Sequence, residues 1–242
     1  MQERPVQELL GWATRFDEAG IDSLWIADYL ALPQDVDHRW YAGWNLLAAL
    51  AGVTARCRIG PLVTTFPYHS SLAMARHVVT IDALSDGWLD LGIGIGGAPV
   101  DRAFGGLPDA SFGELAETLD RGLTATLALL DGHRLPVPAA PVLKERPGPA
   151  DIALGTPYPQ FGRLPIVAGG HSPRSLDVAA KHAHRWNTFG SRPGPAMSSR
   201  RSIERATSSP NAAWPSAEIR PKSPDPSCRT SIHRSQRTAL MS

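Results

Sequence analysis

Two glycine-rich segments are the parts of this chain best suited to hold a ligand. The first, residues 169–174, reads Gly-Gly-His-Ser-Pro-Arg and contains a helix-capping serine. Exposed backbone N–H groups, the positive end of the following helix and Arg174 together suit a phosphate. An ordinary helix N-cap after a tight turn is the alternative. We predict a phosphate-binding loop formed by Gly169, Gly170, Ser172 and Arg174.

The second glycine segment, residues 92–97, matches the spelling Gly-x-Gly-x-x-Gly of a dinucleotide-binding fingerprint. That fingerprint needs a helix opening at its last glycine, and Ala98-Pro99-Val100 delays one. Repeated glycine in a strand also marks the close approach of a flat ligand or another backbone. The alternatives are a Rossmann fold, a strand facing a flavin, and glycines that serve packing alone. We favour the flavin-facing strand, with Gly94, Gly96 and Gly97 forming one wall of the site.

Three polar residues near strand ends are further candidates. Asp28 ends an apolar strand, where a carboxylate is costly unless it meets solvent, an amide, a ligand or a salt-bridge partner. Tyr29 can donate a proton or pack, and the loop residue His69 can contact a ligand or remain solvated. A metal site is not predicted, because the sequence has neither His-Glu-x-x-His nor a cysteine pair.

Strand and helix periods alternate along the chain as far as about residue 190, and we assign residues 1–190 to one domain. Helices are predicted near residues 6–19, 44–53, 72–84, 111–130 and 172–183, and strands near 23–28, 58–65, 87–94, 164–168 and 185–189. Pro61 predicts a bend or bulge in the second strand, and residues 131–163 a long surface insertion. Apolar strands between helices favour a parallel α/β sheet of the TIM-barrel type, incomplete at about five of eight strands. In such a barrel the chemistry lies at the C-terminal strand ends.

Composition sets the class of protein. A chain of 242 residues with 43% hydrophobic residues can form a real core. The longest apolar run is too short for a membrane span, and the polar N-terminus lacks a signal-peptide pattern. We expect a cytoplasmic protein with no membrane partner. Residues 191–242 hold 9 of the 24 Lys/Arg but only 3 of the 23 Asp/Glu, without an apolar period. They predict a disordered tail, and without interleaved aromatics they do not predict nucleic-acid binding.

Several segments, in this order, resemble the bacterial luciferase-like family of flavin-dependent monooxygenases and oxidoreductases: residues 18–28, 58–64, 81–94, 169–176 and 183–187. The resemblance covers roughly residues 5–190. It implies a TIM-barrel variant that binds reduced FMN or, alternatively, the deazaflavin F420. Electrons would pass to oxygen and a small organic substrate, with a flavin reductase as the source of reduced flavin; a homodimer is compatible with this scheme.

The resemblance also assigns roles to residues. Asp28 would lie by the polar edge of the flavin, and Val63-Thr64 match a strand bulge where the family often has a non-prolyl cis peptide. Gly169, Gly170 and Ser172 match the loop that holds the cofactor phosphate, and Tyr29 and His69 are the expected catalytic residues. The chain departs from the family in having Tyr29 where histidine is frequent and no glutamate near Gly97. Family members also start and continue beyond the matched region, so an inactive truncated remnant is the alternative to an enzyme.

Overall fold

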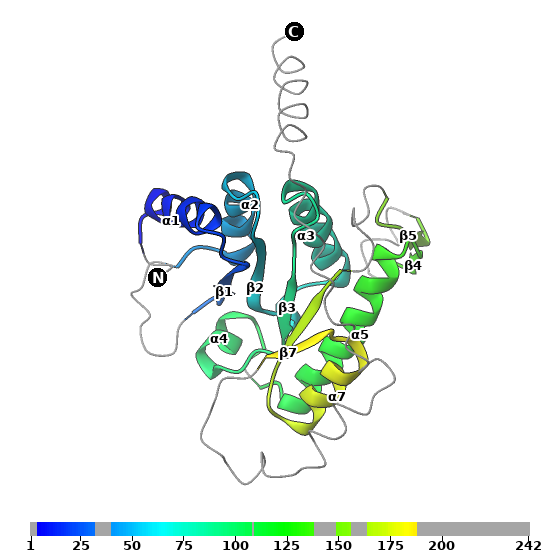
Figure 1. The fold of residues 1–242 in the computed structure, drawn as a ribbon. Coiled ribbons are helices and arrows are strands. Elements are labelled where there is room, and N and C mark those ends of the chain that lie inside the picture. The colour runs from blue at the N-terminus through cyan, green and yellow to red at the C-terminus, as the bar shows by residue number, and fades with distance from the viewer. Residues whose placement is uncertain (1–3, 32–39, 108, 138–148, 156–163, 188–242) are drawn as a thin grey trace.

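A computed structural model describes residues 4–31, 40–107, 109–137, 149–155 and 164–187. The predicted disordered tail lies outside these residues. Five strands form one parallel sheet in the order β1-β2-β3-β6-β7 (Figure 1): β1 Ser23–Asp28, β2 Arg58–Thr65, β3 Leu91–Gly94, β6 Ile166–Gly169 and β7 Arg185–Asn187. Each strand pairs with the next along the chain, as in a barrel, whereas a Rossmann sheet reverses its order. The prediction of a partial TIM-type barrel is confirmed, and the Rossmann alternative is excluded.

Helix α1 Val6–Glu18 precedes β1, and further helices connect successive strands of the sheet (Figure 1): α2 Gly43–Val53, α3 Ser71–Leu84, α5 Phe112–Leu130 and α7 Pro173–His182. All five follow the sequence periods closely. At the start of α5, the side chains of Ser111 and Glu114 form a capping box, which the spacing Ser-x-x-Glu in the sequence indicates. Buried apolar residues from the helices and strands form one core cluster. Among the described residues, no helix is long and apolar enough to cross a membrane.

Three parts of the chain are more structured than their sequence patterns indicated. The segment after the glycine strand, for which no helix is predicted, contains the short helix α4 Pro99–Phe104, and a 3-10 turn, η1 Phe66–Tyr68, follows β2. Proline at the first helical position suits a helix start. Inside the predicted insertion, β4 Leu135–Pro136 pairs antiparallel with β5 Asp151–Ile152. All these elements are too short to produce a period in the sequence.

The predicted irregularity in β2 is present. The pairing of β1 with β2 slips between Ile26 and Asp28, whose partners are Pro61 and Thr64, and the Leu62–Val63 peptide bond within the slip is cis. Glycines keep the neighbouring strands close here. A Cβ on Gly92 would lie 1.8 Å from the Pro61 carbonyl oxygen, so this glycine of the fingerprint spelling serves strand packing.

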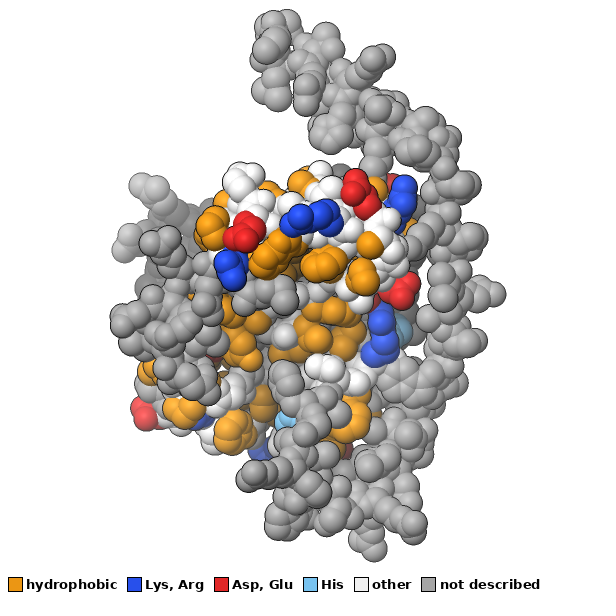
Figure 2. All heavy atoms as spheres, turned by 60° about the vertical axis from the view of Figure 1, so that its left-hand side comes forward, with side chains coloured by type: hydrophobic (Ala, Val, Ile, Leu, Met, Phe, Trp, Pro, Cys, Tyr) orange, Lys and Arg blue, Asp and Glu red, His pale blue; other side chains and the backbone are white. Residues whose placement is uncertain are grey.

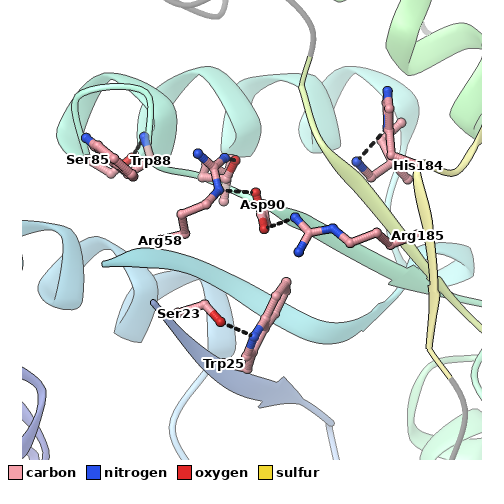
Figure 3. A network of polar contacts seen from close by, with 10 residues as sticks. Ser23, Trp25, Arg58, Ser85, Trp88, Asp90, His184 and Arg185 are labelled. Atoms are coloured by element: carbon pink, nitrogen blue, oxygen red, sulfur yellow. Dashed lines mark hydrogen bonds and ion pairs between the residues drawn. The ribbon is translucent and has the colours of Figure 1, made fainter. Parts of the chain in front are cut away.

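Charged residues join the strands at their N-terminal ends. Arg58 of β2 and Arg185 of β7 converge from two sides on Asp90, whose side chain is fully buried (Figure 3). Asp17 of α1 is also buried, and its carboxylate accepts hydrogen bonds from three successive backbone N–H groups, those of Ala55, Arg56 and Cys57. Burial acts to raise the pKa of Asp17, but these hydrogen bonds outweigh it and the pKa is lowered. This end of the sheet is built for stability.

β1 and β7 are the outer strands of the described sheet. On the side of the molecule that carries α1, hydrophobic side chains gather in the middle of the face (Figure 2). Phe16 on α1 and Ile21, in the loop to β1, are among the exposed large hydrophobic residues. An open sheet edge with apolar residues nearby agrees with a partial rather than a closed barrel.

Candidate active site

The C-terminal ends of the strands bring most of the predicted site residues to one edge of the sheet. Pairing aligns Asp28 with Thr64, Thr65 with Gly94, and Gly169 with Asn187. Because all five strands are parallel, residues that are distant in sequence meet at this edge. The edge therefore collects a carboxylate, a hydroxyl and several glycines.

Asp28 is bound from two directions. Its Oδ1 accepts a hydrogen bond of 3.1 Å from the backbone N–H of Gly43, the first residue of α2. Its Oδ2 accepts one from the Thr64 hydroxyl. A helix start has unpaired N–H groups and a positive partial charge, and α2 has no side-chain cap of its own, so Asp28 supplies the missing acceptor. A carboxylate at this position was expected to meet solvent, an amide, a ligand or a salt-bridge partner, and the structure shows a hydrogen bond from a backbone amide, that of Gly43.

Two histidines and a tryptophan complete this cluster. Nε2 of His69 lies 3.4 Å from the Thr64 hydroxyl oxygen and 3.8 Å from Oδ2 of Asp28. The Trp44 indole N–H donates to the same hydroxyl oxygen at 3.2 Å. His77 of α3 stacks on Trp44, with ring centroids 4.9 Å apart, and its ring stands perpendicular to the His69 ring, with centroids 5.8 Å apart. We call Asp28, Trp44, Thr64, His69 and His77 the polar cluster.

The environment decides which members of the polar cluster are charged. Burial acts to raise the pKa of Asp28, but the approach of His69 and the hydrogen bonds from Thr64 and Gly43 outweigh it and lower the pKa. For His77, burial and the neighbouring His69 lower the pKa, although Asp28 acts in the opposite direction. Asp28 is therefore a carboxylate at neutral pH, and His77 is a neutral imidazole.

Tyr29 lies next to the polar cluster on a segment that a second carboxylate holds. Its ring meets the Trp40 ring at a centroid distance of 6.2 Å. The backbone N–H groups of Leu30 and Ala31, which follow it, both donate to Oδ1 of the buried Asp101 on α4. The Tyr68 hydroxyl of η1 donates to Oδ2 of Asp101 at 3.0 Å. One carboxylate thus ties together the exits of β1 and β2 and the start of α4.

The predicted glycine wall has three different environments. The Val63 side chain occupies the space beside Gly94 and Gly169, since a Cβ on either would lie 2.7 or 3.0 Å from it. Gly96 has a φ of +73°, which favours glycine, and a Cβ there would meet Thr65. Around Gly97 a Cβ would meet no atom within 4 Å. The glycine wall is therefore open at Gly97, whereas at Gly94 the Val63 side chain covers the backbone.

The predicted phosphate loop has the turn and cap that its sequence indicates. Gly170 adopts a φ of +151°, and Ser172 caps α7 by accepting the N–H of Ser175. A Cβ on Gly170 would lie 2.5 Å from the Ser175 hydroxyl, so the turn needs glycine. The Arg174 guanidinium lies over Gly113 in the first turn of α5, where a Cβ would be 2.0 Å from it. The structure therefore places the arginine between two helix starts.

Comparison with known proteins decides the family. A profile of the luciferase-like monooxygenases matches residues 1–219. The chain belongs to this family. Its relatives include a 4-hydroxyprotoasukamycin monooxygenase from Streptomyces nodosus subsp. asukaensis, 31% identical over 121 residues, and an F420-dependent glucose-6-phosphate dehydrogenase from Amycolatopsis mediterranei, 34% identical over 104 residues. These matches cover 47% and 41% of this chain and 29% and 30% of the relatives, so this luciferase-like chain spans under a third of each.

Solved structures of luciferase-like enzymes share the fold. An F420-dependent secondary alcohol dehydrogenase superimposes with a TM-score of 0.65 at 16% identity, covering 84% of this chain and 62% of that structure. The oxygenating constituent of 3,6-diketocamphane monooxygenase from Pseudomonas putida, in complex with FMN, gives 0.62 at 20% identity, covering 86% and 58%. The family consists of oxidoreductases and monooxygenases, and its members use FMN or F420.

Sequence reasoning missed four residues of this site: Gly43, Trp44, His77 and Asp101. They lie on helices, where glycine, tryptophan, histidine and aspartate carry no periodic signal of function. Only Asp101 has a local signal: it follows a proline that suits a helix start, and a carboxylate that becomes buried at such a place needs hydrogen-bond donors. Among the described residues, no group of three His, Cys, Asp or Glu side chains gathers closely enough to hold a metal ion.

Proposed function

We propose that this chain is a flavin-dependent oxidoreductase that binds FMN at the C-terminal edge of its sheet and acts on a small organic substrate with oxygen. The observation that carries the proposal is the polar cluster, which gathers a carboxylate and two histidines from separate elements beside glycine-lined backbone. Membership of a family of oxidoreductases supports it. A flavin reductase as the source of reduced FMN belongs to the same proposal.

The residues fit the proposed cofactor. Open space at Gly97, where an added Cβ would meet no atom within 4 Å, leaves that part of the sheet edge accessible to a flat ring system. The turn at Gly170 and the start of α7 at Ser172 suit a phosphate, because a helix start favours an anion. FMN, when bound, supplies the redox chemistry of the reaction.

The chain's own residues have the tasks of binding and proton handling. Asp28, held as a carboxylate by Gly43 and Thr64, is the acceptor for an N–H group at the polar edge of a ligand. His69 is the acid–base candidate, because an imidazole can accept a proton at one ring nitrogen while the other stays protonated, and its Nε2 lies 3.8 Å from Oδ2 of Asp28. Tyr29 is the second catalytic candidate, since its position follows Asp28 directly and Asp101 holds the segment behind it.

A fluorescence titration of the full chain with FMN and with F420 tests the proposal. We expect saturable FMN binding that Gly170→Val abolishes, because a side chain there would enter the space of Ser175. Gly155→Val is the matched control: this glycine also has a positive φ, of +76°, but it lies outside the site. Uptake of neither cofactor by a chain that melts cooperatively would refute the proposal and favour the inactive remnant.

F420 is the second candidate cofactor, because one relative and two solved neighbours are named for it. Saturable binding of F420 with no binding of FMN would assign the chain to the F420-dependent dehydrogenases and reductases of the family. Tyr29→Phe and His69→Gln variants then separate the catalytic candidates, since a residue that handles a proton changes the pH profile of turnover as well as its rate.

A further inference from the structure

The polar cluster contains enough hydrogen-bond donors and acceptors to fix where each proton lies. The Thr64 hydroxyl has one proton to donate and two lone pairs to accept with. Its oxygen lies 2.5 Å from Oδ2 of Asp28, and a carboxylate can only accept. The hydroxyl proton therefore points to Asp28. The Trp44 indole is a donor only, so it occupies one of the lone pairs of Thr64.

His69 faces the acceptors that remain on Thr64 and Asp28. Its Nε2 faces the other lone pair of Thr64 at 3.4 Å and Oδ2 of Asp28 at 3.8 Å. If Nε2 carried a lone pair, it would face two oxygen acceptors with no proton between them. If Nε2 carries the proton, both oxygens attract it. The second ring nitrogen, Nδ1, has no hydrogen-bond partner among the described residues.

We propose that Thr64 and Asp28 act as positioning residues that hold His69 in the Nε2–H tautomer, so that Nδ1 is the nitrogen that exchanges a proton with the ligand. This inference rests on the proposed function, because it names the acid–base atom of that site. When Nδ1 takes a proton from a bound ligand, the imidazolium keeps its Nε2–H toward Thr64 and Asp28. The proton returns from Nδ1 to the ligand or to water, which restores the neutral ring.

The surrounding groups support this assignment. The groups facing His69 are Asp28 from β1, Thr64 from β2 and His77 from α3. His77 stacks on Trp44 and has a lowered pKa, so it stays neutral and does not compete with His69 for the carboxylate. The ion-pair partner of Asp28 among the described residues is His69.

Long-range proton–nitrogen NMR of histidine-labelled protein, without any cofactor, reads the tautomer directly. The spectra are recorded at a pH where His69 is neutral, and His69→Gln assigns its signals. We expect protonated Nε2 and unprotonated Nδ1 in the wild type. His184 is the internal reference, because its Nδ1 accepts the backbone N–H of Ile166 at 3.0 Å and must be unprotonated in the folded chain.

Asp28→Asn should reverse the tautomer. The amide oxygen stays on the Gly43 N–H, so the amide NH₂ faces Thr64 and donates to its oxygen. The Thr64 hydroxyl then turns its proton to Nε2 of His69, which leaves Nδ1 protonated. Thr64→Val removes the hydroxyl and should lower the Nε2–H to Nδ1–H ratio about five- to tenfold, as expected for one lost hydrogen bond. Thr64→Ser keeps the hydroxyl and should restore the ratio.

A wild-type His69 protonated at Nδ1 overturns the inference, as does an Asp28→Asn variant that keeps Nε2–H while His184 reports a folded chain. If His184 shows that Asp28→Asn is unfolded, the Thr64→Val and Thr64→Ser pair decides. The cofactor titration is read separately. FMN binding with an Nδ1–H histidine defeats this inference alone, and the expected tautomer without binding of either cofactor defeats the proposed function alone.

Discussion

Replacing Gly43 by alanine tests whether the start of α2 holds Asp28 in place. An alanine Cβ would lie 2.6 Å from Oδ1 of Asp28 and 2.9 Å from its Cβ. Ordinary carbon contacts are about 3.5–4.0 Å, so the helix start and the carboxylate must separate by roughly 1 Å. The separation breaks the 3.1 Å hydrogen bond from the Gly43 N–H to Asp28.

The structure sets the expected size of this effect. A hydrogen bond to a charged group contributes about 1.5–3 kcal/mol, whereas alanine in place of glycine in a helix returns at most about 1 kcal/mol. We expect a net loss of about 1–2 kcal/mol in the free energy of unfolding. For a chain of this size that lowers the Tm by about 2–4 °C per kcal/mol.

Urea and thermal unfolding followed by circular dichroism measure this loss, and the FMN titration shows whether the displaced carboxylate also weakens cofactor binding. The matched control is Gly52→Ala in the last turn of the same helix, where a Cβ would meet nothing within 4 Å. There we expect a gain of about 0.5–1 kcal/mol. A Gly43→Ala chain as stable as Gly52→Ala, with unchanged FMN binding, would refute the role of α2 in holding Asp28.

Three further changes test the supports of the sheet and of α5. Asp17→Asn should cost about 1–3 kcal/mol at pH 7; because the folded-state pKa of Asp17 is lowered, its contribution is present above the usual carboxyl pKa and is lost as the pH falls through the folded value. Urea unfolding at pH 7 and pH 3 should therefore show a smaller pH dependence in the variant. Asp90→Asn should cost about 2–4 kcal/mol by leaving two arginines without their buried partner, whereas the exposed pair of Glu117 should lose under about 0.5 kcal/mol in Glu117→Gln; equal losses would contradict this. Ser111→Ala should lower the stability by about 1 kcal/mol through loss of the cap of α5, and an unchanged unfolding midpoint would count against it.

The sequence was sufficient for the architecture because the strands and long helices have clear periods. The Pro61 irregularity and the Ser111 cap were also visible, since each depends on a local rule of backbone geometry. The polar cluster was visible only in part. Asp28 and Thr64 lie at the C-terminal ends of strands and His69 follows one, where parallel topology predicts that they meet, but Trp44 and His77 reach them from two helices.

Contacts made by tertiary packing could not be predicted in the same way. Glycine is a poor helix former, so the sequence of α2 alone does not explain a glycine at position 43. The explanation is the carboxylate of Asp28 on β1, which leaves no room for a side chain there. The tie from Asp101 to the segment after Tyr29 joins residues about seventy positions apart, and no local pattern encodes such a distance.

The position of Val63 between Gly94 and Gly169 limits how this sheet edge can change in evolution. The three residues come from three different strands and share one space. Their combined volume is therefore nearly constant, and an alanine at position 94 or 169 requires a smaller side chain at position 63. Homologous chains should show opposite changes in residue size at these positions, and a glycine or alanine at position 63 should make room for the replacement of either glycine.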